Sequence, residues 1–217
     1  MRTRGGVTTV GVEGAFGHNV FINCPFDKEY RPLLEALLFT VIECGLEPRI
    51  ASETSDSGEV RIEKVKRLVR ASRYSVHDIS RIETQGSLPR FNMPFELGLD
   101  LGCREYGDRG CRSKKALILE QKQYRYQQVL SDIAGQDIKA HDGESRRLVK
   151  CVRDWVVETV STSGVPSASR IWQRLTDFHG ALAPALAEQG YTQNEFEEMP
   201  VPEFIRFIKE WRSVNAG

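Results

Sequence analysis

The hydrophobic positions of the chain fall into short apolar runs that alternate with longer stretches of helical spacing. Compact apolar runs at 19–24, 46–51, 74–79 and 115–120 predict four β-strands, and a weaker run at 136–141 predicts a short edge strand. The strands are separated by connections long enough to hold helices. Strands joined in this way favour a parallel sheet that is covered by helices on both faces, so the pattern predicts an α/β fold.

The connections themselves carry the spacing of amphipathic helices. The ranges 28–44, 57–70 and 145–160 repeat apolar residues at intervals of three and four, which is the period of a helix with one buried face. The helix at 57–70 is basic and has no interleaved aromatic residues, which is typical of a solvated face. A stretch rich in Ser, Gly and Pro at 161–169 then interrupts the pattern, and the aromatic-rich range 165–217 predicts a small module of two or three helices.

The segment RFNMPFELGLDLG at 90–102 is ambiguous when its residues are considered alone. Its apolar residues alternate strictly, which is typical of a strand, although a proline and two glycines fill the gaps between them. A helix is expected because the segment connects two predicted parallel strands, and Pro94 is tolerated in a first turn. At helical spacing Asn92, Glu96 and Asp100 share one ridge, while the proline and the two glycines form a second, nearly bare ridge.

The same helix assignment gives its polar residues specific expected positions. Asn92 is expected to cap the helix, which places Glu96 near the positive end of the helix dipole, where an ionised carboxylate is favoured. Glu96 at such a position is either a capping partner or a catalytic group. Asp100, one turn later, is expected to pair with a nearby arginine.

Length, composition and charge restrict the possible functions. The 217 residues suit a flexible N-terminal arm at 1–18, an α/β domain at 19–162 and the helical module at 165–217. Thirty basic and thirty acidic residues give a formal net charge of zero, so we expect no direct nucleic-acid binding. The first residues lack an apolar core, which predicts neither a signal peptide nor a membrane span and favours a cytoplasmic protein. The five cysteines are scattered without a C-x-x-C pair, which predicts reduced thiols, no disulfide framework and no metal site.

Polar residues gather where the predicted strands end. Because ligands of open parallel sheets bind outside the carboxyl ends of the strands, these residues are expected to meet Glu96 in one pocket. Asp27 has a second interpretation as a helix N-cap, and His77 inside the third strand is expected to be a packed histidine rather than a base. The candidate binding residues are Asn23, Pro25, Phe26, Asp27, Ser80, Arg81, Arg90 and Asn92, and Asp78 at the end of the third strand joins Glu96 as a candidate catalytic residue.

Three stretches resemble the signature regions of nucleoside 2-deoxyribosyltransferases and of divergent bacterial TIR-like proteins: VFINCPFDKEY, YSVHDIS and NMPFELGLDLG. The resemblance covers residues 19 to 160 and implies a flavodoxin-like parallel sheet. It implies a Pro-Phe turn at Pro25 and Phe26, an acidic strand end at Asp78 and a catalytic carboxylate at Glu96. Both families attack an N-ribosidic bond. The resemblance implies NAD or a related nucleotide as the substrate, no separate cofactor, and a role in bacterial antiphage defence.

The chemistry of N-glycosidic cleavage suits these residue types. Cleavage develops positive charge on the ribose, which an ionised Glu96 would stabilise or trap covalently. Asp78 would hold a ribose hydroxyl or assist proton transfer to the leaving base. Phe26 would stack on a base, and Arg81 or Arg90 would meet a phosphate.

Three functions remain open at this stage. The first is a nucleotide N-glycosidase, the second a nucleotide-sensing module whose C-terminal helices contact a partner, and the third a true deoxyribosyltransferase. The presence of both Glu96 and Asp78 favours chemistry over sensing. The resemblance further implies activity as a homo-oligomer or together with a defence-partner protein.

Overall fold

A computed structural model describes residues 15–81, 90–160 and 164–215, so residues 1–14 of the expected N-terminal arm lie outside the described residues. Its centre is a five-stranded, all-parallel sheet with the order β2-β1-β3-β4-β5. The predicted α/β fold is therefore confirmed, including the edge strand. The strands are β1 (Asn19–Asn23), β2 (Glu47–Ile50), β3 (Tyr74–Asp78), β4 (Lys115–Glu120) and β5 (Ile138–Ala140).

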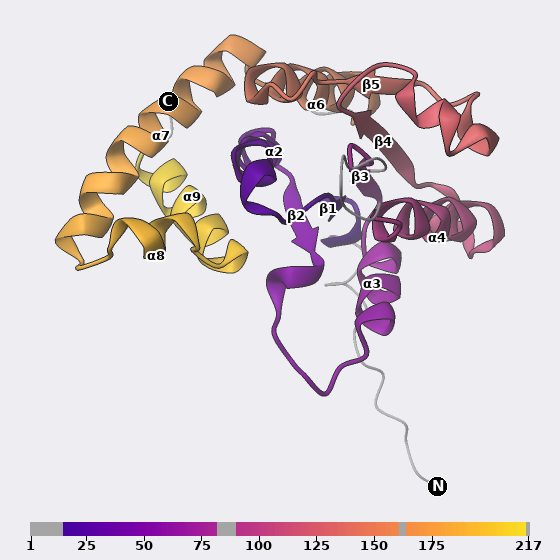
Figure 1. Ribbon diagram of the computed structural model, residues 1–217, viewed down its shortest axis with the longest axis horizontal. Helices are drawn as coiled ribbons and strands as arrows, with labels where there is room; N and C mark the ends of the chain where they lie inside the picture. The colour runs from indigo at the N-terminus through magenta and orange to yellow at the C-terminus, as the bar shows by residue number, and fades with distance from the viewer. Residues whose placement is uncertain (1–14, 82–89, 161–163, 216–217) are drawn as a thin grey trace, which may run out of the picture.

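Helices cover both faces of this sheet (Figure 1). The helices α2 (Arg31–Glu43) and α6 (Ser145–Thr159) lie on one face, while α3 (Arg61–Arg70) and α4 (Asn92–Tyr106) lie on the other. The short helix α5 (Arg109–Arg112) follows α4, and single 3-10 turns occupy Lys28–Tyr30, Ala51–Glu53, Arg125–Gln128 and Ser131–Ile133.

The alternation of side chains along β1 divides the core between the two faces. Val20 and Ile22 belong to the large apolar cluster that contains α2 and α6, whereas Phe21 packs with Val65 and Leu68 of α3. Each of these residues is buried. A strand that is apolar on both sides must lie between two layers, which is why the sheet is covered on both faces.

The C-terminal helices α7 (Ala168–Glu188), α8 (Gln193–Glu197) and α9 (Val201–Val214) pack on the outer side of α2 (Figure 1). The ring of Phe178 lies 5.6 Å from Phe39 of α2 and 5.7 Å from Phe204 of α9, measured between centroids. Arg174 of α7 donates two hydrogen bonds to Glu43 at the end of α2, at 2.6 and 3.1 Å. The helical module thus shares one continuous core with the α/β part.

The ambiguous segment at 90–102 forms the helix α4, as expected, but two local predictions were wrong. The N-cap is Phe91 rather than Asn92, and no side chain caps this end. Glu96 is therefore the fifth residue of the helix and lies beyond the first turn, where the influence of the helix dipole is concentrated. The ridge that includes Gly98 does not approach another element of the described chain, because a Cβ atom added there would meet nothing within 4 Å.

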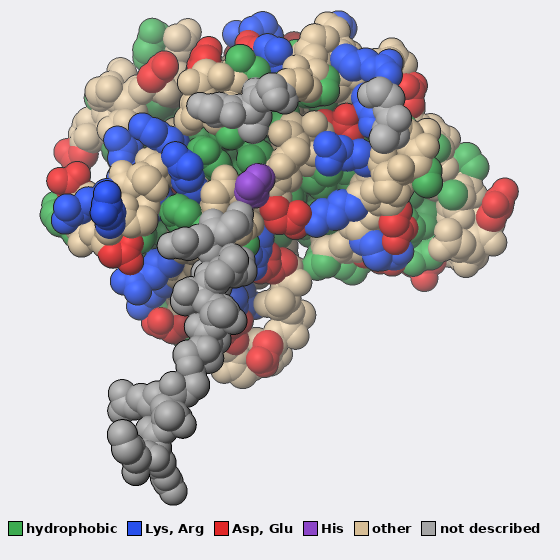
Figure 2. All heavy atoms as spheres, turned by 180° about the vertical axis from the view of Figure 1, so that it is seen from behind, with side chains coloured by type: hydrophobic (Ala, Val, Ile, Leu, Met, Phe, Trp, Pro, Cys, Tyr) green, Lys and Arg blue, Asp and Glu red, His purple; other side chains and the backbone are tan. Residues whose placement is uncertain are grey.

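Acidic and basic side chains are interspersed on the face of the molecule shown in Figure 2. Lys66 and Arg67 on the basic helix α3 are exposed and paired with Glu63 and Glu59, so the predicted solvated face is confirmed. Within the described residues, no helix is long and apolar enough to cross a membrane.

Candidate functional site

The strand order places a crevice between the carboxyl ends of β1 and β3. In a sheet with the order 2-1-3-4-5 the connections leave β1 and β3 toward opposite faces, so their ends separate and leave room for a ligand. The loop after β1 carries residues 24–27, and the loop after β3 carries residues 79–81. Most of the residues that the sequence nominated lie at this edge of the sheet.

Glu96 of α4 is a buried carboxylate that accepts no hydrogen bond from the described residues. Its side chain is 10% exposed, and its nearest ionic partner is Arg61 at the start of α3, with 3.9 Å between Oε1 and a guanidinium nitrogen. Within the described part of the chain, no group donates a hydrogen bond to Glu96. Burial raises the pKa of Glu96, and the nearby Arg61 and His77 only partly oppose that rise. The sequence argument expected a helix dipole to favour the ionised form, whereas burial dominates in the structure.

Asn23 and His77 fix the start of α4 against the sheet. The Asn23 amide nitrogen donates to the Met93 carbonyl at 2.9 Å and lies 3.0 Å from His77 Nδ1. Since the amide is the donor, Nδ1 of His77 is the acceptor and Nε2 carries the hydrogen. His77 is fully buried, which agrees with a packed histidine. Asn23 therefore holds the turn of helix that precedes Glu96, and both of its contacts are within the protein.

Asp100, one turn beyond Glu96, has three polar partners: His77 and Ser75 at Oδ2, and the ion pair with Lys114 at Oδ1, which accepts no hydrogen bond from the described residues. The His77 Nε2 atom lies 3.1 Å from Asp100, the Ser75 hydroxyl donates to it at 2.6 Å, and Lys114 lies 3.0 Å away. Burial would raise the pKa of Asp100, but these three partners outweigh burial and hold it far below its usual range. The expected arginine partner was wrong, because a histidine, a serine and a lysine take its place.

Asp78 is completely buried in a hydrogen-bond network on the opposite face of the sheet. Tyr30 donates to its Oδ2 atom at 2.5 Å, and the backbone amide and hydroxyl of Ser80 donate to Oδ1 at 2.9 and 2.5 Å. His141 Nε2 lies 2.9 Å from Oδ2. Burial acts to raise the pKa of Asp78, yet the hydrogen bonds from His141, Ser80 and Tyr30 outweigh it and lower the pKa. Both carboxylate oxygens are thus occupied by the protein itself.

The grouping of Ser80, His141 and Asp78 does not have the geometry of a nucleophilic triad. The Gly143 amide donates to His141 Nδ1 at 3.1 Å, so Nε2 carries the hydrogen and faces both Asp78 and Ser80. A base that activates a serine needs a free nitrogen lone pair toward the hydroxyl and a carboxylate on its other nitrogen. Here the serine and the aspartate share the same nitrogen, so the cluster holds Asp78 in place.

The two arginines nominated for phosphate binding meet Asp27. Arg81 lies 2.9 Å from Asp27 Oδ1 and 3.0 Å from Glu29, and Arg90 lies 3.4 Å from Asp27 Oδ2. Asp27 also accepts from the Tyr30 amide at 3.0 Å, which confirms its predicted role as an N-cap. These partly exposed cations are paired in the ligand-free chain and would have to exchange partners to contact a phosphate.

The remaining nominated residues differ in their exposure. Phe26 is 44% exposed and Asn92 is exposed, whereas Pro25 is buried. On the α2 side, a cleft of about 230 Å³ opens beside Arg81; its other lining residues are Glu29, Tyr30, Leu33, Ser80, Gln121, His141 and Gly143. Glu96 belongs to α4 on the other face, so the structure brings Glu96 and this cleft to one edge of the sheet but onto different sides.

Cys24 lies between the acidic residues of this edge. Burial raises the pKa of the Cys24 thiol well above its ordinary value, and the charges of Asp78, Glu96 and Asp27 raise it further.

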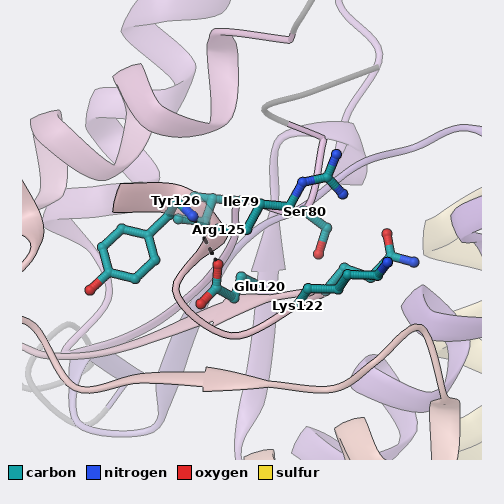
Figure 3. Close-up of a pocket in the computed structure, with 7 residues that line it drawn as sticks. Ile79, Ser80, Glu120, Lys122, Arg125 and Tyr126 are labelled. Atoms are coloured by element: carbon teal, nitrogen blue, oxygen red, sulfur yellow. Dashed lines mark hydrogen bonds between the residues drawn. The ribbon is translucent and has the colours of Figure 1, made fainter. Parts of the chain in front are cut away.

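The carboxylate of Glu120 at the end of β4 also accepts hydrogen bonds from the protein backbone. The amide of Tyr124 donates to its Oε1 atom at 2.8 Å, and the amide of Tyr126 donates to Oε2 at 3.1 Å. Figure 3 shows this carboxylate turned toward Tyr126 beneath a small pocket that Ile79 and Ser80 also line. Glu120 shapes the loop after β4.

Sequence reasoning missed three residues of the site, Tyr30, His141 and Arg61. Tyr30 and His141 complete the Asp78 network, and Arg61 is the ionic partner of Glu96. Only His141 had a usable signal, because it is the last residue of the predicted edge strand. No protein-family model, curated protein or solved structure matches the chain.

Proposed function

We propose that the chain cleaves the N-glycosidic bond of NAD or a related nucleotide, with Glu96 as the catalytic carboxylate. The observation that carries the proposal is the state of Glu96, which is 10% exposed, has a raised pKa and accepts no hydrogen bond from the described residues. Burial of a carboxylate without such a partner is costly, and proteins retain such groups mainly where a ligand or a reaction uses them.

The reaction requires a negative charge next to the ribose. As the bond between C1′ and the base nitrogen breaks, its electron pair moves to the nitrogen and positive charge develops on the sugar. Glu96 would stabilise that charge or form a transient ester at C1′. Water then supplies the hydroxyl to C1′ and releases a proton, which completes the hydrolysis. Once ionised, Glu96 would be reactive, because no described residue donates a hydrogen bond that would compete for its oxygens.

The satisfied state of Asp78 supports a substrate with a cationic base. A neutral nucleobase needs a proton as it departs, whereas the nicotinamide of NAD is cationic and leaves as a neutral molecule. Asp78 is buried, its pKa is lowered, and both of its oxygens accept hydrogen bonds from the protein. Such a group is a poor proton donor. This favours NAD over the neutral nucleosides that a deoxyribosyltransferase would use.

The test is base release by the purified protein. NAD, nucleosides and deoxynucleotides are incubated with it separately, and the free base is followed by chromatography. We expect nicotinamide release from NAD, and we expect Glu96→Gln to lower the rate about 100-fold or more, the scale on which a single catalytic group contributes. Glu105→Gln is the matched control, because Glu105 is exposed on the same helix and should leave the rate unchanged.

Two outcomes would contradict the proposal in different ways. Equal rates for Glu96→Gln and wild type would remove Glu96 from the mechanism but leave the enzyme class. The assay is run on dilute protein and on protein concentrated enough to self-associate. If NAD binds under both conditions and no base is released, the nucleotide-sensing alternative is favoured.

A further inference from the structure

A second cleft, far from Glu96, gathers cations at the junction of α2, α7 and α9. Its volume is about 690 Å³, within the range of small-molecule sites. Four of its lining residues are cationic, and one is acidic. The cations are Arg170, Arg174, Lys209 and Arg212, and the acid is Glu43 at the last position of α2.

The single carboxylate of this cleft is already shared. Arg174 binds Glu43 with two hydrogen bonds at 2.6 and 3.1 Å, and Arg212 approaches it at 3.7 Å. Lys209 forms an ion pair with Glu47, which does not line the cleft. Both side chains are nearly half exposed, so this ion pair is weak. Among the described residues, none forms an ion pair with Arg170, which is exposed at the rim. The cleft therefore has an excess of positive charge although the chain as a whole is neutral.

A groove of comparable size on α3 has a smaller excess of positive charge. That groove, of about 750 Å³, is lined by Lys66, Arg67 and Arg70 with Glu63. Lys66 pairs with Glu63 at 2.7 Å, and Arg67 pairs with Glu59 at 2.8 Å. Two grooves of similar size thus differ in their number of cations, four against three, with one lining carboxylate in each.

We propose that the cleft between α2, α7 and α9 binds a small molecule that carries an oligophosphate group. Arginine forks bind phosphate oxygens in pairs, and several adjacent phosphates match several adjacent cations. Arg174 is held rigidly by Glu43 and by its hydrogen bond to the Asn215 carbonyl at 2.8 Å, so it forms a fixed floor. The exposed Arg170 and Arg212 would close on the ligand from the rim.

This site is separate from the proposed catalytic centre. Glu43 and Tyr30 flank opposite ends of α2, a helix of 13 residues, which corresponds to about 20 Å along its axis. Binding in the cleft is therefore measured independently of base release, and the failure of either proposal leaves the other standing.

The experiment uses inorganic tripolyphosphate as the probe and the full chain as the protein. Binding is followed by calorimetry at an ionic strength of about 0.15 M, where weak surface attraction is screened. Trp211 provides a second readout, because the guanidinium of Arg174 lies 4.9 Å from its ring centroid. We expect saturable binding at one site per chain, with a change in tryptophan fluorescence.

The variants distinguish a built site from general attraction. Arg170→Gln combined with Arg212→Gln should weaken binding about tenfold or more, and Arg170→Gln alone should have an intermediate effect. Lys66→Gln combined with Arg70→Gln removes the same charge from the groove on α3 and should change affinity less than about twofold. Unchanged melting temperatures would confirm that each variant is folded.

Three results would overturn the proposal. These are the absence of saturable binding at millimolar tripolyphosphate, an equal loss of affinity in both double variants, and binding of a single-stranded oligonucleotide that tripolyphosphate does not displace. The first removes the site, the second reduces it to net charge, and the third assigns the cations to a nucleic acid.

Discussion

Two buried carboxylates on successive turns of α4, Glu96 and Asp100, have different hydrogen-bond partners and opposite pKa shifts. Asp100 receives His77, Ser75 and Lys114, and its pKa is lowered despite burial. Glu96 lies four residues earlier on the same ridge. Its ionic partner among the described residues is Arg61 at 3.9 Å, and its pKa is raised. Both residues lie on the same ridge of α4 and both are buried. Their pKa values therefore differ because the neighbouring elements present hydrogen-bond donors to Asp100 and not to Glu96 within the described residues.

Asp78 extends the comparison to the other face of the sheet. It is the most deeply buried of the three carboxylates, yet Tyr30, Ser80 and His141 lower its pKa. Burial by itself is therefore not what distinguishes a functional carboxylate in this chain. Asp100 accepts hydrogen bonds at Oδ2 and has only the ion pair with Lys114 at Oδ1, whereas no described residue donates a hydrogen bond to either oxygen of Glu96.

The largest expected effect on stability comes from replacing Asp100, the carboxylate that accepts hydrogen bonds. Asp100→Asn replaces a carboxylate by an amide that presents hydrogens to existing donors, and it leaves Lys114 buried without its anion. We expect a loss of about 3 kcal/mol in the free energy of unfolding, measured by urea denaturation. Glu96→Gln should change the free energy of unfolding by less than about 0.5 kcal/mol or increase it, because among the described residues it removes only the ion pair with the exposed Arg61.

Equal destabilisation by the two substitutions would show that Glu96 has structural partners after all. A small effect of Asp100→Asn would show that the partners of Asp100 contribute little to stability, which also contradicts the expected difference between the two residues. Glu105→Gln on the exposed face of α4 serves as the baseline for both.

The pH dependence of stability should separate the two carboxylates by sign. The folded-state pKa of Asp100 is lowered from its ordinary 3.8, so its contribution is present above that value and is lost as pH falls through the lowered folded-state pKa. The folded-state pKa of Glu96 is raised from its ordinary 4.5. The folded state then holds a proton longer than the unfolded state, and stability falls as pH rises from 4.5 through the raised value.

Denaturation curves at several pH values test this sign. The stability of Glu96→Gln relative to wild type should increase as pH rises through the window just above 4.5, and should be constant on either side of it. A relative stability that decreases in that window would mean that the ionised form of Glu96 is favoured by the fold, contrary to the geometry.

The smallest effect concerns Arg61, the ionic partner of Glu96 among the described residues. Its side chain is 62% exposed and 3.9 Å away, so Arg61→Ala should alter stability by less than about 0.5 kcal/mol. Its charge nevertheless lowers the pKa of Glu96, and its removal should move the acid limb of the base-release profile to higher pH. Arg67→Ala, on the same helix but paired with Glu59, should leave the limb in place. An identical shift for both variants would indicate a general charge effect.

The fold was largely predictable from the hydrophobic pattern. The run at 115–120 coincides with β4, and the strands at 19–23, 74–78 and 138–140 fall within one or two residues of the predicted bounds. The segment at 90–102 needed topology as well, because its alternating apolar residues alone indicate a strand, whereas a parallel neighbour on each side requires a crossing helix.

The candidate site was only partly predictable. The sequence placed Glu96, Asp78, Asp27 and Arg81 at the correct edge, because the ends of parallel strands always meet there. It did not indicate that Asp78 would be saturated by Tyr30 and His141. Those partners are 48 and 63 residues away along the chain, and no local spacing records such a contact.

The sequence by itself determined the order of strands and helices, the α/β class and the position of a carboxylate on the helix after β3, because each depends on local periodicity and on the rule that parallel strands need crossovers. Only the tertiary structure decided which carboxylates are satisfied. A hydrogen bond acts over about 3 Å between groups that folding brings together, and the donors around Asp78 and Asp100 come from distant strands and loops. The same packing leaves Glu96 buried with no hydrogen-bond donor among the described residues, and this difference distinguishes it from Asp78 and Asp100.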